Sequence, residues 1–192
     1  MRELDLSTFD NSTHDRGRSL LVQSLWFFFG LPILRCPVLP SSAVRRFVLR
    51  VFGARVGVGV VLKPGVRVKY PWFLSIGDHS WIGEDCWIDN LVPVTIGTEC
   101  CVSQGVYLCT GNHDWSDRSF AYRLGGIVIE DGAWIGAKSV VCPGVTVARL
   151  GVLAAGSVAR ANIPEKEIHS GNPAIFLKHR SFRGDKESAS VS

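Results

Sequence analysis

The chain has 192 residues, of which 46% are hydrophobic and 20% are charged, so wholesale disorder is excluded and one domain with a short extension is expected. The 21 basic and 17 acidic residues leave a net charge of +4, which is too small to indicate nucleic-acid binding. The six cysteines include no CxxC pair, so neither a disulfide scaffold nor a structural zinc site is predicted, and a reducing compartment, the cytoplasm, is expected.

Residues 1–55 differ in composition from the rest and predict a helical N-terminal arm. Apolar residues at helical spacing indicate helices over 20–30 and 42–52, with Gly53 placed to end the second. The most apolar stretch, 20–34, is too short to span a bilayer. The arm contains eight arginines and four acidic residues. Because of this positive charge, we expect it to lie on the inner face of an anionic membrane, or to pack against protein, rather than to cross the membrane.

Residues 56–164 follow a six-residue repeat that predicts the fold. Each hexad starts with an aliphatic residue, its second position is often Gly, and its fifth position is small or medium. Such hexads form a left-handed parallel β-helix in which the first and fifth side chains point into a triangular prism. Fourteen of the fifteen lead residues are Ile, Leu or Val: Val56, Leu62, Val68, Ile76, Ile82, Ile88, Ile96, Val102, Leu108, Ile129, Ile135, Val141, Val147, Leu153 and Ala159.

Three hexads make one coil, so the repeat predicts about five coils, starting at residues 56, 76, 96, 129 and 147. Small bulges are expected after Val68 and Ile88, and one insertion loop over 109–128 interrupts the third coil. Residues 165–192 are predicted to form a short C-terminal tail with a turn at Gly171 and a disordered end.

The insertion carries the strongest candidate for chemistry. A long loop in a regular prism is a departure that usually has a function. It opens with the sequence Thr-Gly-Asn-His-Asp-Trp over 110–115, and His113 is the one histidine beside a coil interruption. His79 lies on an outer turn and is expected to be structural.

Several stretches resemble the hexapeptide-repeat acyltransferases, most closely the colanic acid biosynthesis acetyltransferase type and more distantly the galactoside and maltose O-acetyltransferases. The resemblance covers roughly residues 6–180. Its most specific parts are the Asn-His pair of the insertion and the terminal Gly-Asn-Pro-Ala. The matching stretches are residues 6–11 (LSTFDN), 63–72 (KPGVRVKYPW), 87–91 (WIDNL), 110–114 (TGNHD), 132–137 (GAWIGA) and 171–174 (GNPA).

The resemblance implies transfer of an acetyl group from acetyl-CoA to a saccharide hydroxyl, in exopolysaccharide synthesis, by a cytoplasmic homotrimer. The family's catalytic histidine falls on His113, and its neighbour Asn112 is the second residue expected in the catalytic site. The chemistry is reasonable, because imidazole titrates near neutral pH and can take the hydroxyl proton as the oxygen attacks the thioester. No acyl-enzyme is needed, because both substrates can be held together.

The resemblance also places the binding residues. The family's acceptor-site asparagine falls within the pair Asp89 and Asn90: spacing favours the first and residue type the second. Trp134 matches a tryptophan near the family's active site. The residues that match the coenzyme A contacts, or that offer cations for its 3′-phosphate, are Ala137, Ala155, Arg160, Lys178 and Arg180.

Other functions remain as alternatives. The acceptor could be an antibiotic or another small molecule, and a non-catalytic scaffold is a different class. A β-helix carbonic anhydrase needs three histidines on adjacent faces, whereas the prism offers only His79 and His113, so no metal is expected. A thiol mechanism through Cys109 or Cys142 lacks a separate base.

Overall fold

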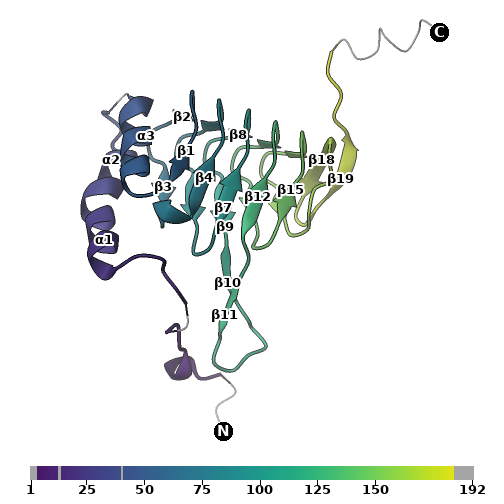
Figure 1. Ribbon diagram of the computed structural model, residues 1–192. Coiled ribbons are helices and arrows are strands. Elements are labelled where there is room, and N and C mark those ends of the chain that lie inside the picture. The colour runs from purple at the N-terminus through teal and green to yellow at the C-terminus, as the bar shows by residue number, and fades with distance from the viewer. Residues whose placement is uncertain (1–3, 13, 40, 184–192) are drawn as a thin grey trace, which may run out of the picture.

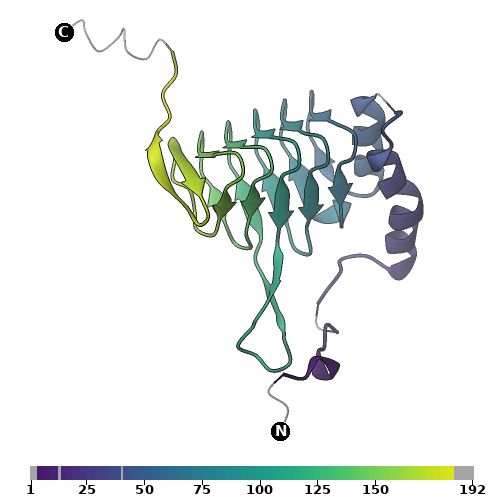
Figure 2. The same cartoon turned by 180° about the vertical axis from the view of Figure 1, so that it is seen from behind.

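Short parallel strands stack into three flat faces that close into a prism (Figures 1 and 2). The computed structural model describes residues 4–12, 14–39 and 41–183. Each turn of chain contributes one strand to each face before it moves up to the next coil. This is the left-handed parallel β-helix predicted from the repeat.

The three faces are named A, B and C in the order in which the chain visits them. Face A contains β1 (Arg55–Val56), β4 (Leu74–Ile76), β7 (Val94–Ile96), β12 (Ile127–Ile129) and β15 (Thr146–Val147). Face B contains β2 (Val61–Leu62), β5 (Trp81–Ile82), β8 (Cys101–Val102), β13 (Trp134–Ile135), β16 (Val152–Leu153) and β18 (Glu167–Gly171), with β19 (Ala174–His179) at its edge. Face C contains β3 (Arg67–Val68), β6 (Trp87–Asp89), β9 (Tyr107–Cys109), β14 (Val140–Val141) and β17 (Val158–Ala159).

The lead residue of each hexad fills the prism interior. Fourteen of the fifteen are buried, and Val56 in the first coil is half-buried. Their register reproduces the predicted spacing, since Val56, Ile76, Ile96, Ile129 and Val147 are successive partners on face A. The small fifth-position residues are buried as well, and polar ones are satisfied: the Ser80 hydroxyl donates to the Gly97 carbonyl at 2.7 Å.

Glycine occupies the second hexad position because the next coil approaches closely there. A Cβ on Gly77 would lie 2.5 Å from the carbonyl carbon of Gly97 in the next coil. Coils stacked at the spacing of a β-sheet therefore leave no room for a side chain at this corner.

The solenoid continues past the five predicted coils. Ile163 forms a parallel bridge with Val147, and β18 pairs with β16 on face B. Strand β19 then folds back antiparallel to β18. Part of the expected tail is thus a partial sixth coil with a covering strand. Ile163 follows Val147 by only 16 residues, which breaks the hexad spacing and hid this coil from the pattern. The predicted disordered end, 184–192, lies outside the described residues.

The arm is helical, as predicted, but its first helix is longer than expected. It comprises α1 (Leu20–Leu25), a π-helical segment η2 (Trp26–Gly30) and α2 (Leu31–Arg35). Proline ordinarily ends a helix at the preceding residue, because it lacks an N–H and crowds the previous turn. Here the wider π-turn comes directly before Pro32, and the helix continues to Arg35. The remaining elements are α3 (Ser42–Val51) and the 3-10 turns η1 (Leu6–Thr8) and η3 (Pro71–Phe73).

Helix α3 covers the open edge of the first coil. The Ser42 hydroxyl donates to the Leu62 carbonyl and accepts from the Leu62 N–H. Arg46 donates to the Val60 carbonyl at 2.6 Å, and Arg50 donates to the carbonyls of Val56 and Gly57. Side chains of the arm therefore satisfy backbone groups that a missing coil would otherwise have bonded.

Arg45 joins the arm to the prism from a fully buried position. Its guanidinium donates to the carbonyls of Leu34, Cys36 and Leu39 in the arm and of Leu62 in the prism. A buried charge is tolerable here because each side of its planar fork meets an acceptor.

We predict that Arg45→Met loosens the arm and lowers the free energy of unfolding by about 3 kcal/mol or more, since it leaves several buried carbonyls without donors. Chemical denaturation measures the loss, and proteolysis of the segment before residue 55 reports detachment. Arg50→Met, at an exposed position with the same type of bond, is the matched control and costs less than about 1 kcal/mol. Equal losses for the two variants would contradict the role of Arg45.

Candidate active site

The insertion is a β-hairpin that leaves the corner between faces C and A (Figure 1). Its strands β10 (Gly111–His113) and β11 (Tyr122–Leu124) pair antiparallel, with His113 opposite Tyr122. Thr110 anchors the root, where its N–H and its hydroxyl both donate to the Asp89 carbonyl. A Cβ on Gly111 would meet Leu91 at 2.5 Å, so glycine lets the hairpin start close to the prism.

His113 is held in one orientation by its surroundings. Its Nδ1 lies 2.6 Å from the Phe120 carbonyl oxygen, and its ring stacks on the Phe120 ring at 4.3 Å. Phe120 has a left-handed φ of 56°, an uncommon conformation for a bulky residue. A carbonyl can only accept, so Nδ1 carries the proton and Nε2 keeps a lone pair in the neutral ring. This arrangement suits a base at Nε2.

The N-terminal segment covers this ring. The Phe9 ring contacts His113 edge-on at 5.4 Å and Tyr122 at 5.1 Å, and the Asp5 N–H donates to the Arg118 carbonyl. The half-buried His113 is thus enclosed on several sides by aromatic rings, which limits ring rotation and excludes water from part of its surface.

The two neighbours of His113 do not bond its ring. Asn112 is exposed, and its side-chain oxygen accepts the His113 backbone N–H at 2.8 Å. In a strand, successive side chains point to opposite faces, so Asn112 lies on the face opposite His113. Asp114 accepts from the N–H and hydroxyl of Ser116 and holds the tip of the hairpin; these bonds lower the pKa of its carboxyl below the ordinary value. The Phe120 carbonyl, not a carboxylate, orients the imidazole.

Asp89 lies at the end of β6, directly below the hairpin root, with its side chain 13% exposed. One carboxylate oxygen is 3.0 Å from the Lys69 ammonium, and the other accepts from the Tyr107 hydroxyl at 3.1 Å. Burial raises the pKa of Tyr107 well above its usual range, and the Cys109 thiol and the Asp89 carboxylate add to the shift, so Tyr107 stays a hydrogen-bond donor. Asp89 is therefore a fixed carboxylate.

Asn90 is placed differently from Asp89. It is fully buried, its amide oxygen accepts the N–H groups of Lys69 and Tyr70, and its amide nitrogen donates to the Tyr70 carbonyl at 2.6 Å. These bonds hold the bulge after β3 in the coil below. Of the two residues named for the acceptor site, Asp89 is the accessible one.

Of the residues predicted to bind coenzyme A, only Arg160 lies at the corner from which the hairpin leaves, and the others lie on other parts of the prism. Ala137 and Ala155 stack at the corner between faces B and C, where the Gly156 N–H donates to the Ala137 carbonyl. Arg160 is exposed at the corner between faces C and A of the fifth coil, and Lys178 is exposed on β19. Arg180 already donates to the carbonyls of Gly132 and Leu150. The width of face C separates Ala137 and Ala155 from the hairpin within one chain.

Trp134 lies on face B with 47% of its surface exposed, and its indole N–H donates to the Ser103 hydroxyl at 2.9 Å.

The two cysteines near the hairpin, Cys109 and Cys142, were the candidates for a thiol mechanism. The Cys109 thiol donates to the Gly111 carbonyl, and burial together with Cys109 raises the pKa of Cys142, which disfavours a thiolate there. Within the described residues, no group of three or more His, Cys, Asp or Glu side chains could hold a metal ion.

A prism of stacked hexads with one long hairpin insertion is the architecture of the hexapeptide-repeat acyltransferases. The family described as "Hexapeptide repeat of succinyl-transferase" matches residues 74–109 and 126–159. Over 176 residues the chain is 35% identical to a protein of Escherichia coli (strain K12) provisionally named colanic acid biosynthesis acetyltransferase WcaF, and the match covers 92% of this chain and 97% of the other. The chain belongs to this family of hexapeptide-repeat acetyltransferases.

Solved structures agree with this membership. A hexapeptide-repeat acetyltransferase from Vibrio cholerae O1 biovar eltor, solved with acetyl coenzyme A, superimposes with a TM-score of 0.76 at 25% identity over 84% of this chain and 88% of the other. A galactoside acetyltransferase in complex with coenzyme A gives a TM-score of 0.75 at 22% identity, over 88% and 84%, and shares the fold. The E. coli galactoside O-acetyltransferase is 28% identical over 79% of this chain and 80% of its own.

Sequence reasoning did not single out the residues that surround the candidate site. Phe120, Tyr122 and Phe9 enclose His113, while Lys69 and Tyr107 hold Asp89. Phe9 and Lys69 lie inside stretches that carry the family resemblance, 6–11 and 63–72, so that resemblance was an available signal for both. Phe120 and Tyr122 reach His113 only through the hairpin pairing, which a hexad pattern does not describe.

We predict that replacing Asn90 destabilises the protein more than replacing Asp89 does. Asn90→Ala should lower the free energy of unfolding by about 2–4 kcal/mol, because it removes partners from buried backbone groups. Asp89→Ala should cost less than about 1.5 kcal/mol, since its partner Lys69 can return to solvent. Urea denaturation of the two variants measures both values. A larger loss for Asp89→Ala would reverse the assignment.

Proposed function

We propose that this acetyltransferase moves the acetyl group of acetyl-CoA to a hydroxyl of a saccharide, in the synthesis of an exopolysaccharide, with His113 as the general base. The single observation that carries the proposal is the bond between Nδ1 of His113 and the Phe120 carbonyl, which leaves a lone pair at Nε2. The names of relatives support the acceptor class, since they include a galactoside O-acetyltransferase and the colanic acid acetyltransferase of E. coli.

The mechanism follows from this orientation. Nε2 accepts the proton of the sugar hydroxyl as the oxygen attacks the thioester carbonyl, and the Phe120 carbonyl stabilises the imidazolium through Nδ1–H. The tetrahedral intermediate then collapses, and the imidazolium returns the proton to the departing coenzyme A sulfur. Asp89 is available to accept a hydrogen bond from another hydroxyl and orient the sugar.

The active unit in this proposal is a homotrimer with sites between neighbouring chains. The hairpin lies on one side of face C, while Ala137 and Ala155 lie on the other side. A neighbouring prism can bring its own corner between faces B and C against the hairpin, so a composite site unites the base with the coenzyme. Trp134, Lys178 and Arg180 join this site only as parts of the neighbour's surface. Arg160 lies at the corner between faces C and A, the corner from which the hairpin leaves, so it can join the site from the same chain. Asn112 faces outward from the hairpin toward the neighbour.

We predict that His113→Ala lowers the rate of acetyl transfer by about 10²–10⁴-fold, the usual contribution of a positioned base. Coils should remain intact, because the side chain lies outside the prism, so acetyl-CoA should still bind. Release of free thiol measures turnover. Near-normal turnover of the variant with a saccharide acceptor would refute the assignment.

The matched control for this experiment is Cys109→Ser, since Cys109 is half-buried at the root of the same hairpin. It should keep turnover within a few-fold of wild type, whereas loss of turnover in Cys109→Ser or Cys142→Ser would favour a thiol nucleophile. A panel of free oligosaccharides and antibiotics, followed by mass spectrometry, identifies the acceptor class. If the enzyme acetylates only the antibiotics, the proposed acceptor would be an antibiotic and not a saccharide.

We predict that two inactive variants restore activity together if sites are composite. His113→Ala removes the base, and Ala155→Trp fills the exposed coenzyme corner. In trimers mixed at equal amounts, about a quarter of sites pair an intact hairpin with an intact corner from the neighbour, so about a quarter of wild-type activity should return. Light scattering should give three times the 21.0 kDa chain mass. A fully active monomer, or no recovery on mixing, would contradict the prediction.

A further inference from the structure

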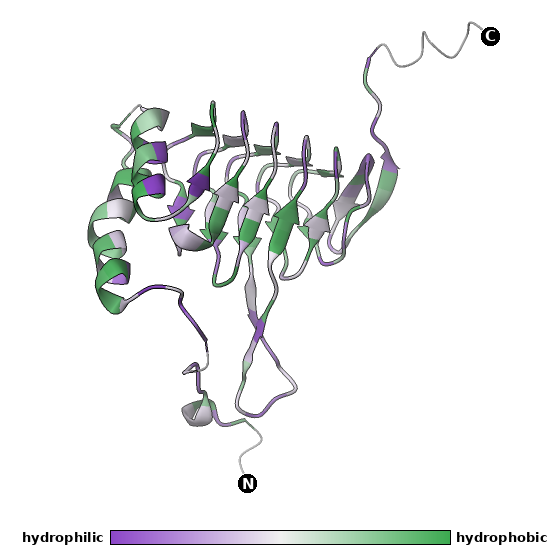
Figure 3. Cartoon of the chain, viewed as in Figure 1, coloured by the Kyte–Doolittle hydropathy of each residue, from purple (hydrophilic) through white to green (hydrophobic). Residues whose placement is uncertain are grey.

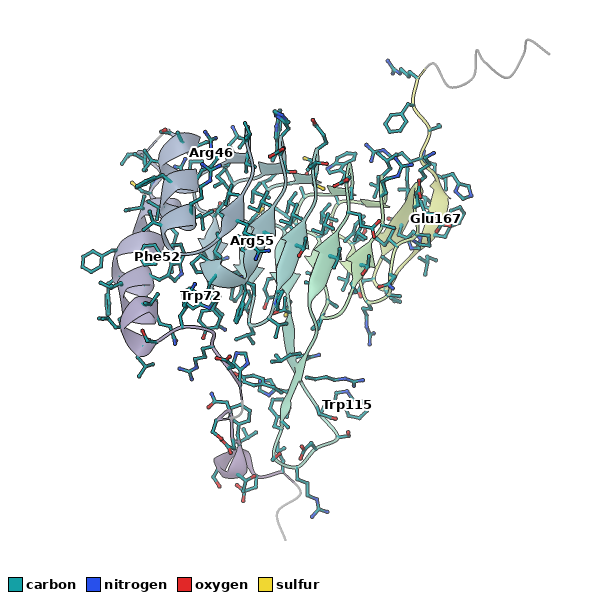
Figure 4. All side chains as sticks on the ribbon, in the orientation of Figure 1. Arg46, Phe52, Arg55, Trp72, Trp115 and Glu167 are labelled. Carbon is teal, nitrogen blue, oxygen red and sulfur yellow. The ribbon has the colours of Figure 1, made fainter. Side chains whose placement is uncertain are left out.

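A groove of about 500 Å³ lies between the helical arm and face C. Its volume falls in the range of small-molecule sites, about 300–1,000 Å³. On the arm side it is lined by Leu20, Phe27, Phe28 and Leu31, and on the prism side aromatic rings including Trp72 line it (Figure 4). Trp26 anchors this wall from a buried position, with its indole N–H on the Val68 carbonyl at 3.1 Å.

Charge in the groove is confined to its prism wall. Arg67 lies 4.7 Å above the ring of Trp87, and Lys69 pairs with Asp89. These three charged residues leave one net positive charge in an otherwise apolar cavity. The guanidinium stacks by its face, so the N–H groups along its edge remain available to an anion. The Lys69 ammonium, which forms an ion pair with Asp89, has three donors that an anion can also engage.

The groove leads to the candidate active site. Asp89 belongs to both, because its side chain lines the groove and its carbonyl binds Thr110 at the hairpin root. From Thr110 to His113 an extended chain covers about 10 Å. The N-terminal segment follows the same path, since the Trp72 indole donates to the Arg16 carbonyl at 2.7 Å and Phe9 rests on His113.

The lining selects a ligand with two chemical parts. A bare sugar carries a hydroxyl on nearly every carbon, and the arm wall offers only Gln23 and Ser24 to satisfy them. A hydrocarbon chain needs no such partners, and a phosphate suits Arg67 and Lys69. We propose that the groove holds the lipid-phosphate end of a lipid-linked saccharide, which places the sugar end at Asp89 and His113. This inference rests on the saccharide acetyl transfer proposed above.

The surface beside the groove fits delivery of such an acceptor from a membrane. On the same helix as the groove wall, Leu21 and Phe29 are 69% and 64% exposed, and this region is predominantly hydrophobic in Figure 3. Exposed apolar residues on a helix flanked by the exposed Arg18 and Arg35 are typical of helices that lie in the interface of an anionic bilayer. Within the described residues no helix is long and apolar enough to span one.

Farnesyl diphosphate, which joins an isoprenoid chain to a diphosphate, is the probe for this groove. Calorimetric titration should show saturable binding at least about tenfold tighter than that of farnesol or of inorganic diphosphate, because each of these lacks one of the two parts. The double variant Arg67→Gln/Lys69→Gln should weaken binding about tenfold or more. Phe28→Ser, at an exposed position, should weaken it about threefold or more.

Lys63→Gln is the matched control, since Lys63 is a half-exposed lysine of the same coil whose partner is Glu84 on another part of the prism; its affinity should stay within about twofold of wild type. Equal binding of inorganic diphosphate would reduce the groove to an anion site and overturn the proposal. Unchanged binding of farnesyl diphosphate by the double variant would also overturn the proposal. A Phe28→Ser variant with unchanged affinity and a reduced oligomeric mass would show that a second copy of the chain covers the groove.

The test separates this inference from the proposed reaction. His113→Ala should bind farnesyl diphosphate as wild type does while failing to transfer acetyl groups. A wild-type enzyme that acetylates free oligosaccharides but does not bind the probe would overturn the lipid-linked acceptor and leave the proposed reaction standing. Binding of the probe without any acetylation of saccharides would overturn the proposed reaction and leave the groove as a lipid-phosphate site alone.

Discussion

The inward packing of one aliphatic side chain every six residues is the constraint on which the whole molecule depends. Once a lead residue fills the prism at each hexad, the chain must turn at a fixed place, and the next coil stacks on the last in register. Extra residues cannot enter this interior, so they are pushed outward at a corner. The bulges after β3 and β6 and the hairpin after β9 are therefore consequences of the same packing rule that builds the core.

The candidate site extends outward from this prism on the hairpin. The hairpin is fixed where it leaves the prism, because Thr110 is bonded to Asp89 and Gly111 lies against Leu91. Farther out, His113 depends on Phe120 and on the N-terminal segment for its orientation. His113 is therefore positioned by three parts of the chain: the end of β6, the hairpin and the N-terminal segment.

Much of the fold could be predicted because the hexad pattern is local: each lead residue signals its own burial. The partial sixth coil could not be predicted, because Ile163 breaks the six-residue spacing. The helix beyond Pro32 could not be predicted either, because a π-turn offsets the usual helix-ending effect of proline. The choice between Asp89 and Asn90 needed the structure, since one step along the chain takes a side chain from the outer surface into a buried corner. His113 could be found as the histidine of the insertion, but its Nδ1 partner depends on how the hairpin pairs.

The antiparallel direction of β19 has a consequence for the length of the solenoid. A parallel β-helix can in principle grow coil upon coil, and its last strand offers a template to any chain of the same shape. Strand β19 runs against that direction and carries a register shift beside Ile168, so the edge that it presents no longer matches a first coil. At the opposite end, α3 occupies the carbonyls of the first coil. The two caps together set the length of the solenoid, because neither end presents a free strand edge that matches the other.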